Sequence, residues 1–125
     1  MEKSRRNRSL LVAIVALFVA SAGSAFGQSI QKADLTNVNI KNFGQMDERF
    51  FRGGQPKEEQ YSQLAALGIK TVIDLTDQPK DYEKSRVEGL GMRYVNIPMS
   101  DKSYPESAKI DEFLKLVDDP TTGKF

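Results

Sequence analysis

The Gly123-Lys124 pair is the first feature of the sequence that could do chemistry. Such a pair can close a nucleotide-binding loop, in which a Gly-x4-Gly-Lys-Ser/Thr segment wraps phosphates with its backbone and binds magnesium through the hydroxyl. Asp118 stands at the first glycine position of that pattern, and Phe125 stands at the hydroxyl position. The segment is therefore better explained as a turn that leads into a strand.

The sequence contains no cysteine and no histidine. This excludes imidazole metal ligands, histidine general bases and cysteine nucleophiles from these 125 residues, together with disulfides and a lipid-attached cysteine. We expect no metal and no cofactor. The formal net charge is +1, and no basic stripe is present, so nucleic acid is not an expected partner.

A hairpin and a helix are predicted first along the domain. Residues 43–46 and 50–53 are short strand-like pieces separated by polar residues, which is typical of a small hairpin. A helix is expected over residues 56–67, because proline is tolerated in a first turn and Gly68 can end the helix in a left-handed conformation.

Strands and helices then alternate. Apolar residues 69–75 predict a buried strand, residues 81–90 a helix, and residues 92–98 a strand that Pro98 ends, since proline cannot donate to a ladder. A turn over residues 119–123 follows a third helix. One face of this third helix is apolar at helical spacing: Ile110, Phe113, Leu114 and Val117.

Such alternation predicts an α/β fold, in which helices cross between mostly parallel strands. Ligands of open sheets of this kind bind at the carboxyl ends of the strands. The loops of interest are therefore those after Leu75 and Ile97, and the one after any strand that begins at Lys124.

Three segments follow one another along the chain: FRGGQP at residues 51–56, LGIKTVIDL at residues 67–75 and YVNIPMSD at residues 94–101. Together they resemble the N-terminal portion of a dual-specificity phosphatase-like domain of the protein tyrosine phosphatase superfamily, especially its small bacterial members. The resemblance covers residues 42–125. It implies a three-layer α/β domain, here incomplete.

The resemblance also implies a chemistry. In that family, the nucleophile is the thiolate of a His-Cys-x5-Arg loop, whose backbone N–H groups bind phosphate and lower the thiol pKa. A phosphocysteine forms, an aspartic acid protonates the leaving oxygen, and water then releases phosphate. Because the sequence has neither cysteine nor histidine, we expect a chain truncated before that loop, with Lys124-Phe125 beginning the strand that carries it.

Asp101 matches the general-acid position of the family, at the end of the YVNIPMSD segment. The alternative is a solvated loop acid or a turn cap. Asp74 and Asp77 are weaker candidates, because Asp74 falls within the predicted strand and Asp77 in a turn-rich loop. Arg52 could bind a substrate phosphate, or it could pair with a carboxylate and support the structure.

Two functional hypotheses follow. In the first, the chain is part of an exported phosphatase that acts on a phosphorylated protein or small molecule, and the fragment alone is inactive. In the second, the chain is a non-catalytic binding module derived from a phosphatase. The second leaves a strand edge and a helix face of the expected sheet uncovered.

The N-terminus predicts export. A basic segment with Lys3, Arg5, Arg6 and Arg8 precedes the uncharged run 10–20, and small residues allow cleavage after Ala25 or Gly27. The apolar run is too short for a membrane-spanning helix, so contact with the membrane would be transient. We therefore expect a signal peptide over residues 1–27, a polar tether or arm over 28–42, the domain over 43–125, and a periplasmic or extracellular location.

Overall fold

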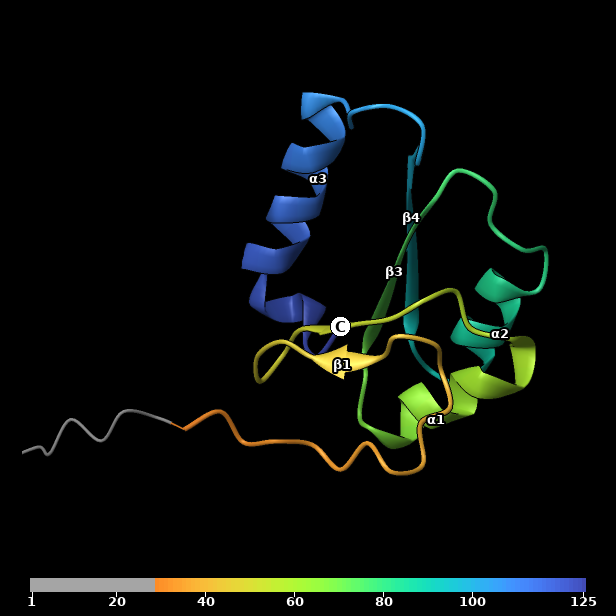
Figure 1. The fold of residues 1–125 in the computed structure, drawn as a ribbon, viewed down its shortest axis with the longest axis vertical. Helices are drawn as coiled ribbons and strands as arrows, with labels where there is room; N and C mark the ends of the chain where they lie inside the picture. Colours follow the sequence, from red (N-terminus) through yellow and green to blue (C-terminus); the bar gives the residue numbers. More distant parts are fainter. Residues whose placement is uncertain (1–28) are drawn as a thin grey trace, which may run out of the picture.

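A computed structural model describes residues 29–125, in which short strands and helices alternate (Figure 1). In chain order the elements are β1 (Gly44–Gln45), β2 (Phe51–Arg52), the 3-10 helix η1 (Glu58–Gln60), α1 (Tyr61–Ala66), β3 (Thr71–Thr76), α2 (Glu83–Gly89), β4 (Arg93–Met99), α3 (Ser107–Asp118) and the 3-10 helix η2 (Pro120–Thr122). The expected signal peptide lies outside the described residues. Within residues 29–125, no helix is both long enough and apolar enough to span a bilayer.

A parallel pair of strands, β3 and β4, forms the centre of the fold. Thr71 lies opposite Arg93 and Asp74 opposite Asn96, and α2 provides the connection between the two strands. Figure 1 shows α3 on one side of this pair and α1 with α2 on the other. The expected α/β fold with a parallel pair and crossover helices is therefore confirmed.

The predicted hairpin is also present, although each strand has only two residues. β1 and β2 pair antiparallel, with Gly44 opposite Arg52. Asp47 Oδ1 orders the turn by accepting the backbone N–H groups of Arg49 and Phe50, both at 2.7 Å. After the hairpin, a Cβ on Gly53 would stand 2.9 Å from the Phe43 ring, so glycine is required there by close approach.

The first helix begins later than expected. Lys57 is extended, with φ −74° and ψ 159°, and its N–H donates to Gln60 Oε1 at 2.8 Å. This local bond starts the 3-10 helix η1, and α-helical geometry follows only from Tyr61. Gly68 ends the helix with φ +80°, as the sequence predicts.

The prediction that Pro98 ends the last strand is wrong by one residue. β4 continues to Met99, and the register shifts between Asp74 and Thr76 on the opposite strand. Within the described residues, β4 has a strand neighbour on one side only. Proline is tolerated on such an edge, because its absent N–H leaves no ladder bond unmade.

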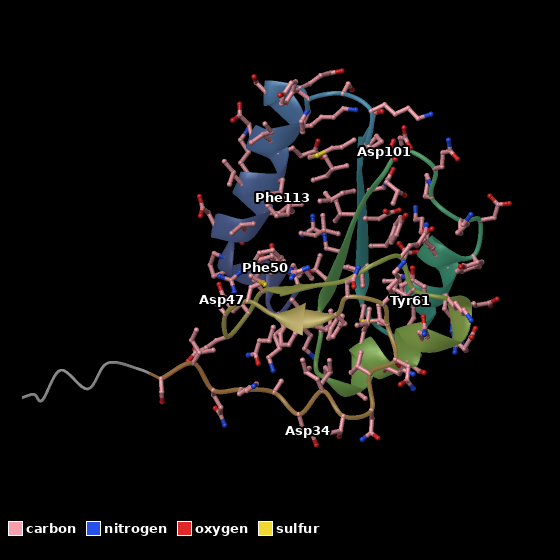
Figure 2. The ribbon with its side chains drawn as sticks, in the orientation of Figure 1. Asp34, Asp47, Phe50, Tyr61, Asp101 and Phe113 are labelled. Carbon is pink, nitrogen blue, oxygen red and sulfur yellow. The ribbon has the colours of Figure 1, made fainter. Side chains whose placement is uncertain are left out.

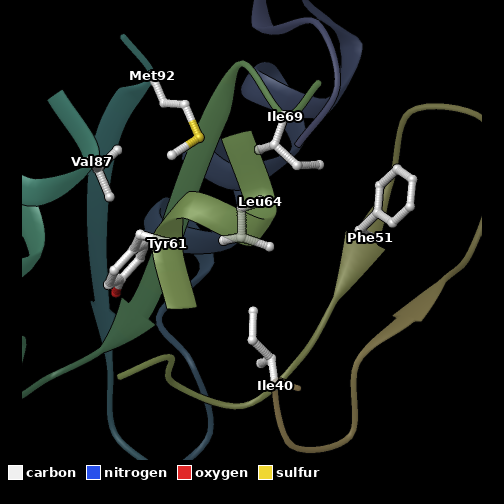
Figure 3. Close-up of a cluster of buried hydrophobic side chains, with 7 residues drawn as sticks. All are labelled: Ile40, Phe51, Tyr61, Leu64, Ile69, Val87 and Met92. Carbon is white, nitrogen blue, oxygen red and sulfur yellow. The ribbon is translucent and has the colours of Figure 1, made fainter. Parts of the chain in front are cut away.

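The main core lies between the sheet and the α1/α2 side (Figure 3). Tyr61 and Val87 are fully buried there, from α1 and α2 respectively. The buried cluster comprises Ile40, Phe51, Tyr61, Leu64, Ile69, Val87 and Met92. Burial of each large apolar side chain stabilises the fold by about 1.5–3 kcal/mol, so this side carries most of the hydrophobic stabilisation.

The apolar face of α3 is covered much less than the core on the α1/α2 side. No residue of α3 is buried, and Ile110 and Leu114 are 41% and 49% exposed. Phe113 and Val117 are half-buried on the same helix. The pattern correctly predicted the helix, and the described residues cover its apolar face only in part.

Residues 31–40 lie along the domain and are tied to it by three glutamine side chains. Gln45 accepts the Ala33 N–H at 2.6 Å and donates to the Gln31 carbonyl at 3.0 Å. Gln63 accepts the Asn39 N–H at 2.9 Å, and Gln60 donates to the Asn39 carbonyl at 2.7 Å. Ile40 then enters the core with 6% exposure.

Candidate functional site

Lys124 and Phe125 lie between β2 and β3 and join them through backbone hydrogen bonds. The Phe125 N–H donates to the Arg49 carbonyl at 2.8 Å, and the Phe51 N–H donates to the Phe125 carbonyl at 2.7 Å. The Lys124 carbonyl accepts from Lys70 and Thr71 at 2.8 and 3.1 Å. Bonds from one residue to the two neighbours of its opposite residue are the pattern of a parallel ladder. The turn before Lys124 thus leads into strand pairing, as the sequence predicted.

Two contacts with the Phe125 ring hold Lys124 and Phe125, the start of this strand, in place. The rings of Phe50 and Phe125 stack with centroids 5.2 Å apart, and Phe125 is only 8% exposed. The Arg49 guanidinium lies 5.7 Å from the centre of the Phe125 ring. Arg49 and Phe50, which directly precede β2, therefore cover Phe125 from two directions.

Arg49 was not predicted to have a role from the sequence. Its guanidinium donates to the carbonyls of Gly123 at 3.1 Å, Asp119 at 3.0 Å and Val117 at 3.4 Å. These acceptors are the end of α3 and the turn after it, so Arg49 clamps the hairpin to that turn. A fork of donors aimed at carbonyls carries no sequence signature, because every residue type supplies a carbonyl.

A cavity of about 280 Å³ opens next to Phe125, between β2 and β3. Its walls combine residues from the hairpin, from β3, from α1 and from α3. Apolar groups predominate, among them Phe51, Leu64, Ile73, Leu75, Phe113 and Phe125. Two acids, Asp74 and Glu83, also line it.

Glu83 is a buried acid whose oxygens are satisfied by hydrogen bonds. It is 2% exposed, and its oxygens accept from the Tyr61 hydroxyl, from the Lys80 N–H at 2.7 Å and from Gln55 at 3.3 Å. Burial raises the pKa of the Tyr61 phenol above its usual range, and the bond to Glu83 raises it further. This network links the segment after β2 to α1 and α2.

Asp74 forms a second such pair on β3. Its Oδ2 accepts the Tyr94 hydroxyl at 2.8 Å, and its Oδ1 accepts the Thr76 N–H at 2.8 Å. Burial, followed by this hydrogen bond, raises the pKa of Tyr94. Asp74 is 8% exposed, so the geometry makes it a part of the sheet's structure.

Asp101 lies two residues beyond the end of β4, in an exposed turn at the carboxyl end of the parallel pair (Figure 2). No hydrogen bond to its side chain is present within residues 29–125. The neighbouring backbone is held by the Lys102 N–H, which donates to Ser100 Oγ at 3.1 Å. Asp77, also exposed, follows β3 at the same end of the pair.

Arg52 lies in β2 and lines the cavity, but its side chain is largely exposed. Its Nε lies 3.3 Å from Met46 Sδ across the hairpin. In the described part of the chain, no carboxylate accepts a hydrogen bond from it. Asp101 and Arg52 therefore belong to different parts of the fold, the end of β4 and the hairpin. Among these same residues, no group of three acids is arranged to hold a metal ion.

Two solved structures resemble this fold. Both are of a protein from Shewanella putrefaciens CN-32 described as a "Putative phosphatase (DUF442)", at 1.60 and 1.40 Å resolution. Each is 29% identical in sequence, with TM-scores of 0.60 and 0.61. The matches cover 68% and 69% of this chain but 56% and 59% of the Shewanella chains, so the chain spans under two thirds of their length.

A comparison with curated proteins gives no significant match. A family model does match this chain. Residues 28–124 match the family described as "DSP-PTPase phosphatase fused to NAD+ Kinase", and the matched range includes all three segments that carry the resemblance seen in the sequence. The chain belongs to this PTP-NADK family of phosphatase domains.

Proposed function

We propose that this chain supplies the general acid and the substrate entrance of an exported, cysteine-dependent phosphatase. The observation that carries the proposal is Asp101, an exposed acid two residues after β4 at the carboxyl end of a parallel pair, in a chain of the PTP-NADK family. Ligands of open α/β sheets bind at this end. A carboxyl with no hydrogen-bond partner within residues 29–125 is free to meet a leaving group.

The proposed reaction has two steps. A thiolate attacks phosphorus, the bond from phosphorus to the ester oxygen breaks, and the Asp101 proton passes to that oxygen. Water then attacks the phosphocysteine, Asp101 takes up a proton from the water, and phosphate and the thiolate are released. The thiolate must come from outside these 125 residues, which contain no cysteine.

Arg52 is the second residue of the proposal. It lies at the edge of the cavity with an exposed guanidinium, and a guanidinium can bind a phosphate through two parallel hydrogen bonds. The competing role is structural, through pairing with a carboxylate. Arg52→Ala separates these roles, because loss of a phosphate contact should raise KM in an active enzyme, whereas loss of a structural contact should lower the free energy of unfolding.

The acid is tested in a chimera that joins residues 29–125 to the C-terminal part of the Shewanella protein. We expect Asp101→Asn to lower kcat for phenyl phosphate by about 100-fold or more, since a poor leaving group needs the proton. The loss for p-nitrophenyl phosphate should be smaller, because nitrophenolate leaves without protonation.

Asp77→Asn is the matched control, since this exposed acid follows β3 at the same end of the pair. It should leave both substrates unaffected. Equal losses for the two leaving groups in Asp101→Asn, or the loss appearing in Asp77→Asn instead, would contradict the role given to Asp101.

The 125-residue chain alone is expected to show no turnover. Purified protein should hydrolyse p-nitrophenyl phosphate no faster than a mock preparation, because a phosphocysteine requires a thiol. Turnover that survives repurification would contradict the cysteine-dependent mechanism itself.

The alternative is a non-catalytic module that binds through the phosphatase scaffold. A module of this kind must be stable by itself. Circular dichroism with thermal melting of a verified monomer distinguishes the two: a cooperative transition supports the module, whereas aggregation without a transition opposes it.

Export is the remaining part of the proposal, and its basis is the sequence of residues 1–27. Mass spectrometry of the exported protein should find a chain that begins at Phe26 or Gln28. Leu17→Arg, which places a charge in the apolar run, should block export. Full-length protein in the periplasm or medium would contradict cleavage.

A further inference from the structure

Glu83 is a buried acid to which the proposed reaction gives no role. It is 2% exposed, and a carboxylate in such a position is costly unless its oxygens accept hydrogen bonds. Its donors come from three separate segments. The Tyr61 hydroxyl donates from α1, the Lys80 N–H donates at 2.7 Å from the loop after β3, and the Gln55 amide donates at 3.3 Å from the segment after β2. One side chain therefore joins residues that lie up to 28 positions apart in the sequence.

The start of α2 and the segment after β2 meet at a second point. The Tyr82 hydroxyl donates to the Pro56 carbonyl at 3.3 Å. Tyr82 directly precedes Glu83, and Pro56 directly follows Gln55, so the two hydrogen bonds join adjacent residues on each side. The loop after β3 is held as well, because Lys80 is bonded to Glu83 through its N–H and through its carbonyl, which accepts the Glu83 N–H at 3.0 Å.

These hydrogen bonds join segments that leave the carboxyl ends of neighbouring strands. Residues 124–125 pair with β2 on one side and with residues 70–71 at the start of β3 on the other, in parallel ladders. The segment after β2 and the loop after β3 therefore flank the path along which the strand begun by residues 124–125 continues. Gln55 and Glu83 both line the cavity on this path.

We propose that Glu83 is a positioning residue of the phosphatase. By holding the segment after β2 to the loop after β3, it fixes the gap through which residues 124–125 lead into the nucleophile loop. The inference rests on the proposed function, which places a nucleophile loop at the end of this strand. Glu83 acts through the backbone on either side of that loop and touches no substrate. Such a frame matters because a misplacement of reacting groups by about 1 Å can lower a rate by about 100-fold.

Asp74 provides a contrast within the same fold. Its side chain also lines the cavity and accepts a tyrosine hydroxyl, that of Tyr94 at 2.8 Å. Its second donor is the Thr76 N–H, so both donors belong to β3 and β4, which already pair along their length. The bonds of Asp74 stay within one sheet, whereas those of Glu83 join separate segments. Tyr94→Phe is therefore the matched control, because it removes a hydrogen bond to a lining acid without releasing either flanking segment.

The first test follows hydrogen exchange in the full 125-residue chain. Gln55→Met removes the donor from an exposed side chain and keeps its length, so the fold should persist. Glu83→Gln replaces one acceptor oxygen with a donor group. We expect the Lys80 amide to exchange about fivefold faster or more in both variants. It should be unchanged in Tyr94→Phe, and the Lys102 amide, in the loop after β4, should be unchanged in all three.

The second test uses the chimera described above. Gln55→Met and Glu83→Gln should each lower kcat by about tenfold for both phenyl phosphate and p-nitrophenyl phosphate, because a displaced nucleophile loop slows attack on either ester. Asp101→Asn differs, since its loss depends on the leaving group. The double variant should lose no more than Glu83→Gln alone, because the two residues act through one hydrogen bond. Tyr94→Phe should retain kcat.

Each outcome decides a separate point. Unchanged Lys80 exchange in both variants would show that the flanking segments are not held by this bond and would overturn the inference. An active chimera in which Gln55→Met keeps full kcat, in which Tyr94→Phe loses as much, or in which the double variant loses the product of the two single losses, would leave Glu83 a purely structural role. An unsubstituted chimera without turnover would instead contradict the proposed phosphatase function. Circular dichroism monitors folding, and Gln55→Met decides the matter if Glu83→Gln does not fold.

Discussion

The two faces of the β3–β4 pair differ sharply in how they are covered. On one face, α1 and α2 place Tyr61 and Val87 in contact with the sheet at 0% exposure. On the other, α3 buries no residue, and Leu114 remains 49% exposed. The fold is therefore held mainly by one face. The other face carries aromatic and aliphatic groups that a further segment could cover, and it adjoins the cavity beside Phe125.

The same substitution on both faces gives the largest expected contrast. Leu64→Ala removes a side chain that is 6% exposed in the main core, and it should lower the free energy of unfolding by about 2–5 kcal/mol. Leu114→Ala on α3 should change it by less than about 0.5 kcal/mol. Urea unfolding followed by circular dichroism measures both, and similar losses would refute a one-sided core.

Arg49→Ala tests the clamp between the hairpin and the α3 side. The change removes donors to three carbonyls and a contact with the Phe125 ring, and we expect a loss of about 2–3 kcal/mol. Arg52→Ala is the control, since this arginine lies in the same hairpin with an exposed side chain. If both variants lose the same stability, the clamp is not the cause.

Tyr61→Phe tests the buried polar pair on the well-covered face. It removes one of the donors to Glu83 and should cost about 1–2 kcal/mol at neutral pH. Equal stability of Tyr61→Phe and the unmodified chain in urea would show that the remaining donors, Lys80 and Gln55, are sufficient.

The Tyr61–Glu83 pair also makes the free energy of unfolding depend on pH in the alkaline range. The pKa of Tyr61 is raised in the folded chain, so the phenol keeps its proton at pH values where the unfolded chain has ionised. The unfolded state then binds fewer protons, and the free energy of unfolding falls as the pH rises above about 10. Urea titrations at about pH 8 and about pH 11 should show a smaller fall in Tyr61→Phe than in the unmodified chain.

The smallest expected effect is that of a charge on the open face. Ile110 is 41% exposed on α3, so Ile110→Lys should change the free energy of unfolding by less than about 0.5 kcal/mol and raise solubility. Val87→Lys, at a fully buried position of α2, is the matched change on the covered face and should prevent folding. A large loss in Ile110→Lys would mean that α3 is packed more tightly in solution.

Local sequence patterns predicted most helices and strands correctly. The β-branched run around Ile73 specified β3, and Gly68 ended α1 at the expected place. Helical spacing in α3 predicted the helix but could not tell how much of its apolar face would be covered, since that depends on which other segments lie opposite. Pro98 misled the strand boundary because its cost depends on whether the strand is at an edge, a property of the sheet as a whole.

Fewer features of the candidate site could be predicted from local sequence patterns. A turn before Lys124 was predictable from its composition, and so was the start of a strand at Lys124, although the 3-10 form of the turn was not. The residues that bind this turn and strand start were not predictable, because Arg49 and Gly123 are 74 residues apart and no local pattern connects them. Asp101 and Arg52 came from the family resemblance, and their roles stay predictions until the chimera is measured.

The bonds of Lys124 and Phe125 also set an order of events during folding. α1, β3, α2 and β4 follow one another closely in the chain, so their contacts close short loops and can form early. The hairpin precedes these elements in the chain, but Arg49 and Phe51 find their partners only when residues 117–125 have been made, 74 positions later in the case of Gly123. Until then, the hairpin is an exposed pair of strands with unpaired edges. We expect a chaperone to bind the growing chain during this interval.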